Sequence, residues 1–131
     1  MTRREAREQA FILIFEKIFQ EDTNLNELIA FAEENEVFKA DEYSVKLAQN
    51  TVENVEKIDA LIMSSLKGWS YNRVSKTSKA ILRMAVSEMF YSEDVPVGAA
   101  INEAVEIAKK YASDDEPAFI NGVLGSVAKE L

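Results

Sequence analysis

The sequence predicts an all-α domain of about seven helices. Apolar residues recur at intervals of three and four along most of the chain, which is the spacing of one buried helix face. Only four glycines and two prolines interrupt the 131 residues. A hydrophobic fraction of 47% at this length is enough to build one sizeable core. We therefore expect a single helical domain spanning residues 1–131.

The first two helices are predicted from their starts. Thr2 and Glu5 have the spacing of a capping box, in which each side chain accepts from the backbone N–H of the other residue. The helix that follows is expected to end near Gln20. Asn24 and Glu27 repeat the capping pattern, so a second, short helix is predicted to follow Asn24.

A longer helical pattern occupies the middle of the chain. Apolar residues recur at helical spacing from Glu42 to Leu66. This length indicates either two helices or one helix that bends near Glu56. Gly68 is expected to end the segment.

Three further helices are predicted after a loop that carries Trp69 and Tyr71. The first is "SKTSKAILRMAVSEMFY", which is strongly amphipathic. Pro96 separates it from the next, "AAINEAVEIAKKYA". Asp115 and Pro117 have the residue types of an N-cap and a first helical turn, so the last helix is predicted to begin there.

Several classes of function are excluded by composition. The chain has no cysteine and no histidine, so it cannot form a disulfide, a thiolate or imidazole zinc site, or a thiol nucleophile. No apolar run approaches the ~20 residues that cross a bilayer, and no secretory signal is present. We expect a soluble cytoplasmic protein that does not contact membranes.

One segment has a misleading likeness to a calcium-binding loop. "DTNLNELIAFAE" places carboxylates and amides at several ligand positions, but Glu27 occupies the sixth position, which needs glycine. Residues 25–32 are also predicted to be helical. We therefore expect no metal, no cofactor and no catalysis.

The negative charge is concentrated in one part of the chain. The formal net charge is −8, yet Glu21 to Glu42 alone hold eight acidic residues and one basic residue. An acidic average therefore does not exclude an anionic partner for the rest of the molecule.

The first basic region is the start of the first helix. At 100° per residue, Arg3, Arg4 and Arg7 lie on the side that the apolar stripe continues. Guanidinium groups at a helix N-terminus suit phosphate, which arginine binds through two parallel hydrogen bonds. Two alternatives stay open: a solvated terminal turn, and ion pairs with the acidic run from Asp114 to Glu116.

The second basic region contains no acidic residue and lies around Trp69 and Tyr71 in the sequence. Aromatic side chains beside cations suit unpaired bases. The alternative is that Trp69 covers the core and the lysines form a solvated face. The cations of this region are Lys67, Arg73, Lys76, Lys79 and Arg83.

Four stretches occur in the order and at the spacing of one known family. They are "RREAREQAF", "SKAILRMAVSEM", "VPVGAAINEAVEIAKKYA" and "FINGVL". In these stretches, which extend over nearly the whole chain, the sequence resembles the NusB family of bacterial transcription antitermination factors. The resemblance implies two small helical subdomains and binding to the boxA element of ribosomal RNA operon leaders. It also implies partnership with NusE, a small-subunit ribosomal protein, and indirect contact with other antitermination factors and RNA polymerase.

The resemblance also implies which residues meet RNA. Arg3, Arg4 and Arg7 match the family's arginine-rich first helix and are expected to contact phosphates, with a log-log salt slope of about −2. Phe119 is expected to stack on a base, although a core role for it stays open. Asp115 lies near this surface and is also expected to be the N-cap of the last helix.

For the protein partner, the resemblance indicates Phe15 on the first helix and the start of the "SKAILR" helix. Ser78 stands where the family usually has an acidic residue, so an ionic contact there is in doubt, whereas Glu88 keeps its carboxylate. Asn121 and Gly122 are expected to allow a close approach of helices rather than to carry chemistry.

Two other functions remain possible from the sequence. A related domain precedes the catalytic domain of certain ribosomal RNA cytosine methyltransferases, but this chain has no catalytic cysteine and no nucleotide-binding strand pattern. A helical protein-interaction adaptor without RNA is favoured if the basic regions pair with the segment from Glu21 to Glu42. The sequence does not distinguish a monomer from a homodimer.

Overall fold

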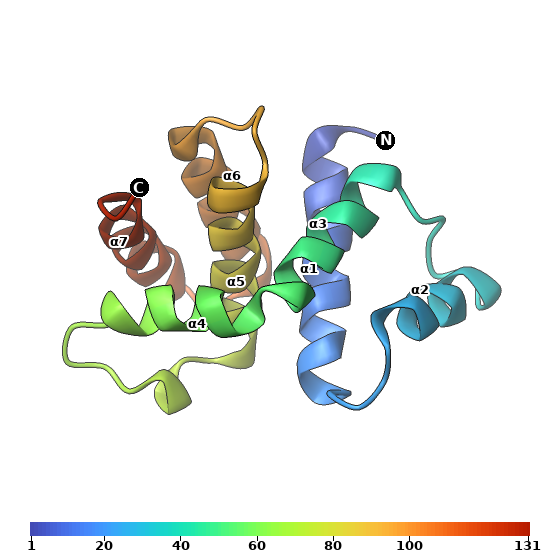
Figure 1. Cartoon of the computed structure of the whole chain (residues 1–131), viewed down its shortest axis with the longest axis horizontal. Coiled ribbons are helices and arrows are strands. Elements are labelled where there is room, and N and C mark those ends of the chain that lie inside the picture. Colours follow the sequence, from blue (N-terminus) through green and yellow to red (C-terminus); the bar gives the residue numbers. More distant parts are fainter.

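The computed structural model describes all residues, Met1–Leu131, and contains seven α-helices and one short 3-10 helix (Figure 1). No strand is present. The predicted all-α fold of about seven helices is confirmed. The helices are α1 (Arg3–Phe19), α2 (Leu25–Glu34), α3 (Glu42–Glu53), α4 (Val55–Ser64), α5 (Lys76–Tyr91), α6 (Val97–Tyr111) and α7 (Glu116–Ala128), with the 3-10 helix η1 at Tyr71–Arg73.

The helices form two groups that share one core. Figure 1 shows α1, α2 and α3 on one side and α4 to α7 on the other. Helix α5 joins the groups because it packs against α1 and α3 as well as against α4, α6 and α7. A continuous cluster of 26 buried apolar residues runs through both groups. None of the helices is long and apolar enough to cross a membrane.

The capping box predicted for the first helix is confirmed in α1, whereas the one predicted for the second helix is only partly formed in α2. Glu5 N–H donates to Thr2 Oγ1 at 3.1 Å and Thr2 N–H donates to Glu5 Oε1 at 2.9 Å, so the capping box is complete. In α2, the Asn24 side chain accepts from Asn26 N–H at 2.7 Å, and Glu27 does not return a bond.

The long middle pattern consists of two helices. Asn54 ends α3 and also precedes α4, and its side-chain amide donates to the Asn50 carbonyl at 2.8 Å. The break therefore lies two residues before Glu56. Beyond α4, Gly68 has a φ of +77°, a left-handed conformation that favours glycine, and it turns the chain toward η1.

The start of α7 differs from the prediction in which residue caps it. Asp115 has a helical backbone conformation and its side chain makes no capping hydrogen bond. The carboxylate of Glu116 accepts instead from Ser113 N–H at 2.8 Å, from Ser78 Oγ at 2.7 Å and from Ser75 Oγ. One carboxylate therefore links the starts of α5 and α7, and Asp115 remains exposed.

Candidate nucleic-acid interface

The three arginines at the start of α1 have three different surroundings. Arg7 is buried: its Nε donates to both carboxylate oxygens of Glu88 at 2.9 and 2.8 Å, and the two side chains are only 8% and 1% exposed. The Tyr43 hydroxyl donates to the same carboxylate. This internal ion pair joins α1, α3 and α5, so the structure leaves neither Arg7 exposed to RNA nor Glu88 exposed to a protein partner.

Arg3 lies on the surface against an aromatic ring. Its guanidinium carbon is 3.8 Å from the centre of the Tyr43 ring. Burial raises the pKa of the Tyr43 hydroxyl, and its hydrogen bond to Glu88 adds to the rise, so the phenol stays neutral at physiological pH. Arg3 makes no ion pair with an acidic side chain, and its charge remains free to meet an anion.

Arg4 is exposed but paired. Its Nε and Nη2 donate to the two carboxylate oxygens of Glu103 at 2.9 and 3.1 Å, while the Arg4 side chain stays 59% exposed. The hydrogen bonds from Arg4 lower the pKa of Glu103. The acidic run from Asp114 to Glu116, the partner considered from the sequence, does not pair with the arginines. A phosphate that binds Arg4 must therefore compete with Glu103.

Beside Arg4 lies a groove of about 590 Å³ between α1, α6 and α7, which we call the Arg4 groove. Its polar lining consists of two cations, Arg4 and Lys109, the carboxylate of Glu106, and two exposed amides, Asn102 and Asn121. Lys109 is 3.1 Å from Glu106 and mostly exposed. Cations suit phosphates and amides suit the hydrogen-bonding edges of bases, so this groove has the chemistry to hold a nucleotide.

The "FINGVL" stretch was interpreted wrongly from the sequence. A Cβ atom added to Gly122 would meet no atom within 4 Å, so this glycine is not needed for close packing of helices. Asn121 is exposed in the Arg4 groove. Its side chain is therefore accessible from solvent and is not used to pack helices.

Phe119 lies on the first turn of α7, next to a second hollow of about 410 Å³. The Phe119 ring is half-buried and packs against the core on one side. Its centre is 5.4 Å from that of the Trp69 ring. Phe119 therefore packs against the core and is still partly exposed, and its stacking on a base stays a prediction. We call this second hollow the Trp69 groove; it is lined by Trp69, Phe119, Arg73, Val74, Ser75, Ser78, Ser113, Asp115 and Glu116.

The predicted partner residues are also distinguished by their burial. Ser78 is 1% exposed and its hydroxyl donates to Glu116, so its side chain is not exposed to a protein partner. Phe15 is half-buried in an aromatic row with Phe11 and Phe19, with ring centres 6.0 and 5.0 Å apart. Phe19 is largely exposed, so this row reaches the surface, and a partner contact at Phe15 stays a prediction.

The second basic region divides into fixed and free cations. Arg83 donates to both oxygens of Asp59 at 2.8 Å, and the Tyr71 hydroxyl donates to Asp59 at 2.7 Å. Lys79 lies 4.5 Å from the centre of the Tyr71 ring, and burial lowers its pKa. These four side chains hold α4, η1 and α5 together. The remaining cations, Lys67, Arg73 and Lys76, are exposed and form no ion pair.

The five ion pairs of the molecule leave out the acidic segment from Glu21 to Glu42. Three cations of the two basic regions, Arg4, Arg7 and Arg83, pair with Glu103, Glu88 and Asp59 instead. Pairing of the basic regions with this acidic segment, which would favour an adaptor that binds only proteins, is therefore not observed.

Two groove residues escaped the sequence prediction. Asn102 and Lys109 lie seven residues apart in "AAINEAVEIAKKYA", on one face and two turns apart, which places both on the polar side of α6. This periodicity was present in the sequence. What it could not indicate is that α1 and α7 lie beside that face.

Comparison with known proteins agrees with the fold and indicates the family. A model of the NusB family matches residues 4–129. The transcription antitermination protein NusB of Acetivibrio thermocellus is 40% identical over 130 residues, which cover 98% of this chain and 90% of that protein. A structure of T. maritima NusB has a TM-score of 0.83 at 32% identity, covering 99% of this chain and 92% of the other. A crystal structure of the antitermination factors NusB and NusE in complex with dsRNA has a TM-score of 0.85 at 29% identity and covers both chains fully.

Proposed function

The chain belongs to the NusB family of transcription antitermination proteins, which are not enzymes, and from this premise we propose how it acts. We propose that it binds boxA-type RNA of ribosomal RNA operon leaders together with NusE, as one domain spanning residues 1–131. Its site of action is the cytoplasm, where the nascent transcript is made. The complex of NusB and NusE with RNA that resembles this fold supports both partners.

The observation that carries the proposal is the Arg4 groove with Arg3 beside it. Arg4 and Lys109 line this groove and are exposed, each beside a carboxylate of α6. The unpaired Arg3 precedes Arg4 on the first turn of α1 and faces Tyr43, so it adds a third cation next to the groove. Two exposed amides line the groove, and Phe119 follows on the first turn of α7. Phosphate-binding cations, base-edge donors and acceptors, and an aromatic ring are the groups by which proteins recognise unpaired RNA.

The proposal replaces one contact that the sequence predicted. Arg7 is buried against Glu88 and is not available, whereas Lys109 supplies a third cation. Three phosphate contacts to single-stranded RNA predict a log-log salt slope of about −2 or steeper. Asp115 lies exposed at the edge of this surface, and its charge weakens binding there.

The experiment measures the affinity of the protein for labelled boxA-type RNA and for scrambled RNA of equal length, with and without NusE, over a range of salt concentrations. We expect modest affinity alone, tighter and sequence-selective binding with NusE, and a slope near −2. Equal affinity for the two RNAs in the presence of NusE, or a slope near zero, contradicts the proposal.

A further inference from the structure

Trp69 is the only tryptophan in the chain and it is 54% exposed, although its ring lies against Phe119, which packs on the core. It follows Gly68, whose left-handed conformation turns the loop, and it precedes η1. Tryptophan has the largest apolar surface of any side chain, so leaving half of it in water is costly unless something covers it. The contact with Phe119, at 5.4 Å between ring centres, still leaves about half of the Trp69 side chain exposed.

We propose that Trp69 and Phe119 together form a platform on which unpaired RNA bases stack, and that Arg73 contacts a phosphate next to it. The inference rests on the proposed function, since it extends the same RNA surface. It assigns a role to the second basic region, which the RNA surface described above does not include.

The first argument is continuity between the two grooves. Pro117 and Ala118 line the Arg4 groove, while Glu116 and Phe119 line the Trp69 groove. The first turn of α7 is therefore the wall that the two grooves share. A strand of RNA held at Arg4 and passing over this turn reaches Phe119 and then Trp69.

The second argument is the distribution of charge around the aromatic pair. Arg73 lines the Trp69 groove, and Lys67 and Lys76 are exposed and near it in sequence, all three without an ion pair. Two carboxylates also line this groove. Glu116 is occupied by three hydrogen bonds from serines, whereas Asp115 is exposed. Phosphates are therefore expected on the Arg73 side of the aromatic pair and away from Asp115.

The third argument concerns what kind of ligand fits. Base stacking tolerates any sequence, because every base has a flat face, and it requires bases that are not already stacked in a duplex. The two ring planes are tilted by 56° relative to each other, so they are oriented in different directions, which suits the turning path of a single strand.

The test uses the fluorescence of Trp69, which reports on this position alone because the chain has no other tryptophan. The protein is titrated with unlabelled boxA-type RNA, excited where tyrosine does not absorb. A labelled RNA measures binding independently. We expect quenching of Trp69 that saturates at the same concentration as binding, and little or no quenching by a duplex of the same sequence.

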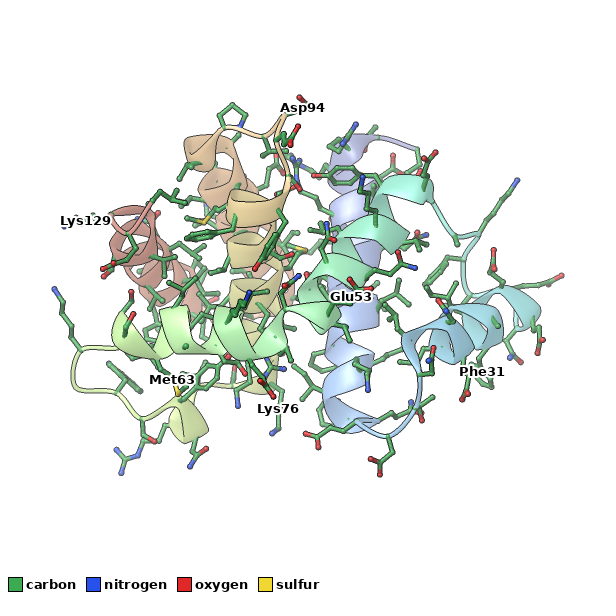
Figure 2. The ribbon with its side chains drawn as sticks, viewed as in Figure 1. Phe31, Glu53, Met63, Lys76, Asp94 and Lys129 are labelled. Atoms are coloured by element: carbon green, nitrogen blue, oxygen red, sulfur yellow. The ribbon has the colours of Figure 1, made fainter.

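Three variants accompany the titration. Trp69→Ala is expected to lower RNA affinity by about tenfold, and Trp69→Phe by much less, because a phenylalanine keeps a stacking face. Arg73→Ala is expected to make the salt slope shallower by about 0.7. Phe31→Ala is the matched control, since it removes an exposed aromatic side chain from α2, at the opposite end of the molecule from α7 (Figure 2). Trp69→Phe also keeps the test valid if Trp69→Ala does not fold.

The outcomes separate this inference from the proposed function. RNA binding without quenching, and with normal affinity in Trp69→Ala and Trp69→Phe, overturns the platform and leaves the function standing. Equal quenching by the duplex overturns base stacking. A change in Trp69 fluorescence on adding NusE alone assigns this face to a protein and overturns the inference. Absence of RNA binding by the unmodified protein with NusE contradicts the proposed function itself.

Discussion

Arg7 differs from Arg3 and Arg4 in what surrounds its guanidinium group. Helical periodicity places the three arginines on one side of α1, but it cannot show that Glu88 of α5 and Tyr43 of α3 close over Arg7. The sequence therefore shows that the three arginines share one side of the helix, but it does not show that Arg7 is buried. A buried charge of this kind is retained only while its partner is present, because an unpaired charge in the core is strongly destabilising.

Replacing Glu88 alone is expected to destabilise the fold. Glu88→Gln leaves the charge of Arg7 buried and uncompensated, so the free energy of unfolding should fall by about 3 kcal/mol. The double variant Arg7→Met, Glu88→Leu removes both charges and should recover most of that loss. Urea denaturation measures both values. If Glu88→Gln is as stable as the unmodified protein, the pair is not buried in solution.

Removing the carboxylate that competes for Arg4 is expected to tighten RNA binding. Glu103→Gln frees the Arg4 guanidinium, and we expect an increase in affinity for boxA-type RNA of about threefold at moderate salt, since an exposed pair is weak. Glu53→Gln is the control, because it removes the same charge from an exposed position at the end of α3 (Figure 2). An equal gain in both variants indicates general electrostatics rather than release of Arg4.

At the scale of the helices, the cap of α1 is determined by neighbouring residues in the sequence, whereas the cap of α7 is not. The capping box of α1 involves residues three apart and was predicted correctly. The cap of α7 was not, because the hydroxyls that hold Glu116 come from Ser75 and Ser78, about forty positions earlier in the chain. A motif of neighbouring residues can be identified from the sequence alone, whereas a contact between the ends of two helices depends on the fold.

The link between α5 and α7 predicts a pH-dependent stability. Burial alone would raise the pKa of Glu116, but hydrogen bonds from Ser75, Ser78 and Ser113 outweigh it and leave the pKa below its ordinary value of 4.5. A depressed pKa in the folded state stabilises the protein above that ordinary value, and the stabilisation is lost as the pH falls through the depressed pKa. Glu116→Gln should therefore lower Tm near neutral pH, and the difference should shrink in acid. Thermal unfolding measures it, with Glu53→Gln as the control; a difference that is constant with pH contradicts this role.

The middle of α7 contains a glycine that the folded chain does not require. Gly122 is helical and an added Cβ atom meets nothing within 4 Å, so Gly122→Ala should raise the free energy of unfolding by about 1 kcal/mol. Urea denaturation tests this value. A loss of stability would instead support the close helix approach expected from the sequence. If the variant is more stable but binds RNA or NusE less well, the glycine is retained for binding.

At the scale of the whole molecule, the composition of the site could be predicted but not its assembly. Arg3, Arg4 and Phe119 were identified from the sequence, and each is exposed or half-buried in a surface hollow or beside one. The Arg4 groove joins residues that are about a hundred positions apart, on α1, α6 and α7, and no local pattern indicates that these helices meet. Asn102 and Lys109 could not be assigned to the groove from the sequence, because that assignment depends on how these helices pack.

The fold also separates the opposing charges. The acidic segment from Glu21 to Glu42 forms α2 and the loops around it, at the end of the molecule opposite α7 (Figure 1). The candidate RNA surface lies on α1, α6 and α7. A net charge of −8 therefore slows the approach of RNA less than the same charge spread evenly would.

The central claim is that exposed cations at the start of α1, and not its arginines as a group, hold the RNA. The most direct measurement compares the affinity for boxA-type RNA, with NusE present, of the double variant Arg3→Ala, Arg4→Ala and of the double variant Arg7→Met, Glu88→Leu. We predict a loss of about tenfold or more for the first and a change of less than about twofold for the second, with both variants folded by circular dichroism. Unchanged affinity in Arg3→Ala, Arg4→Ala, or an equal loss in the two variants, would contradict the account.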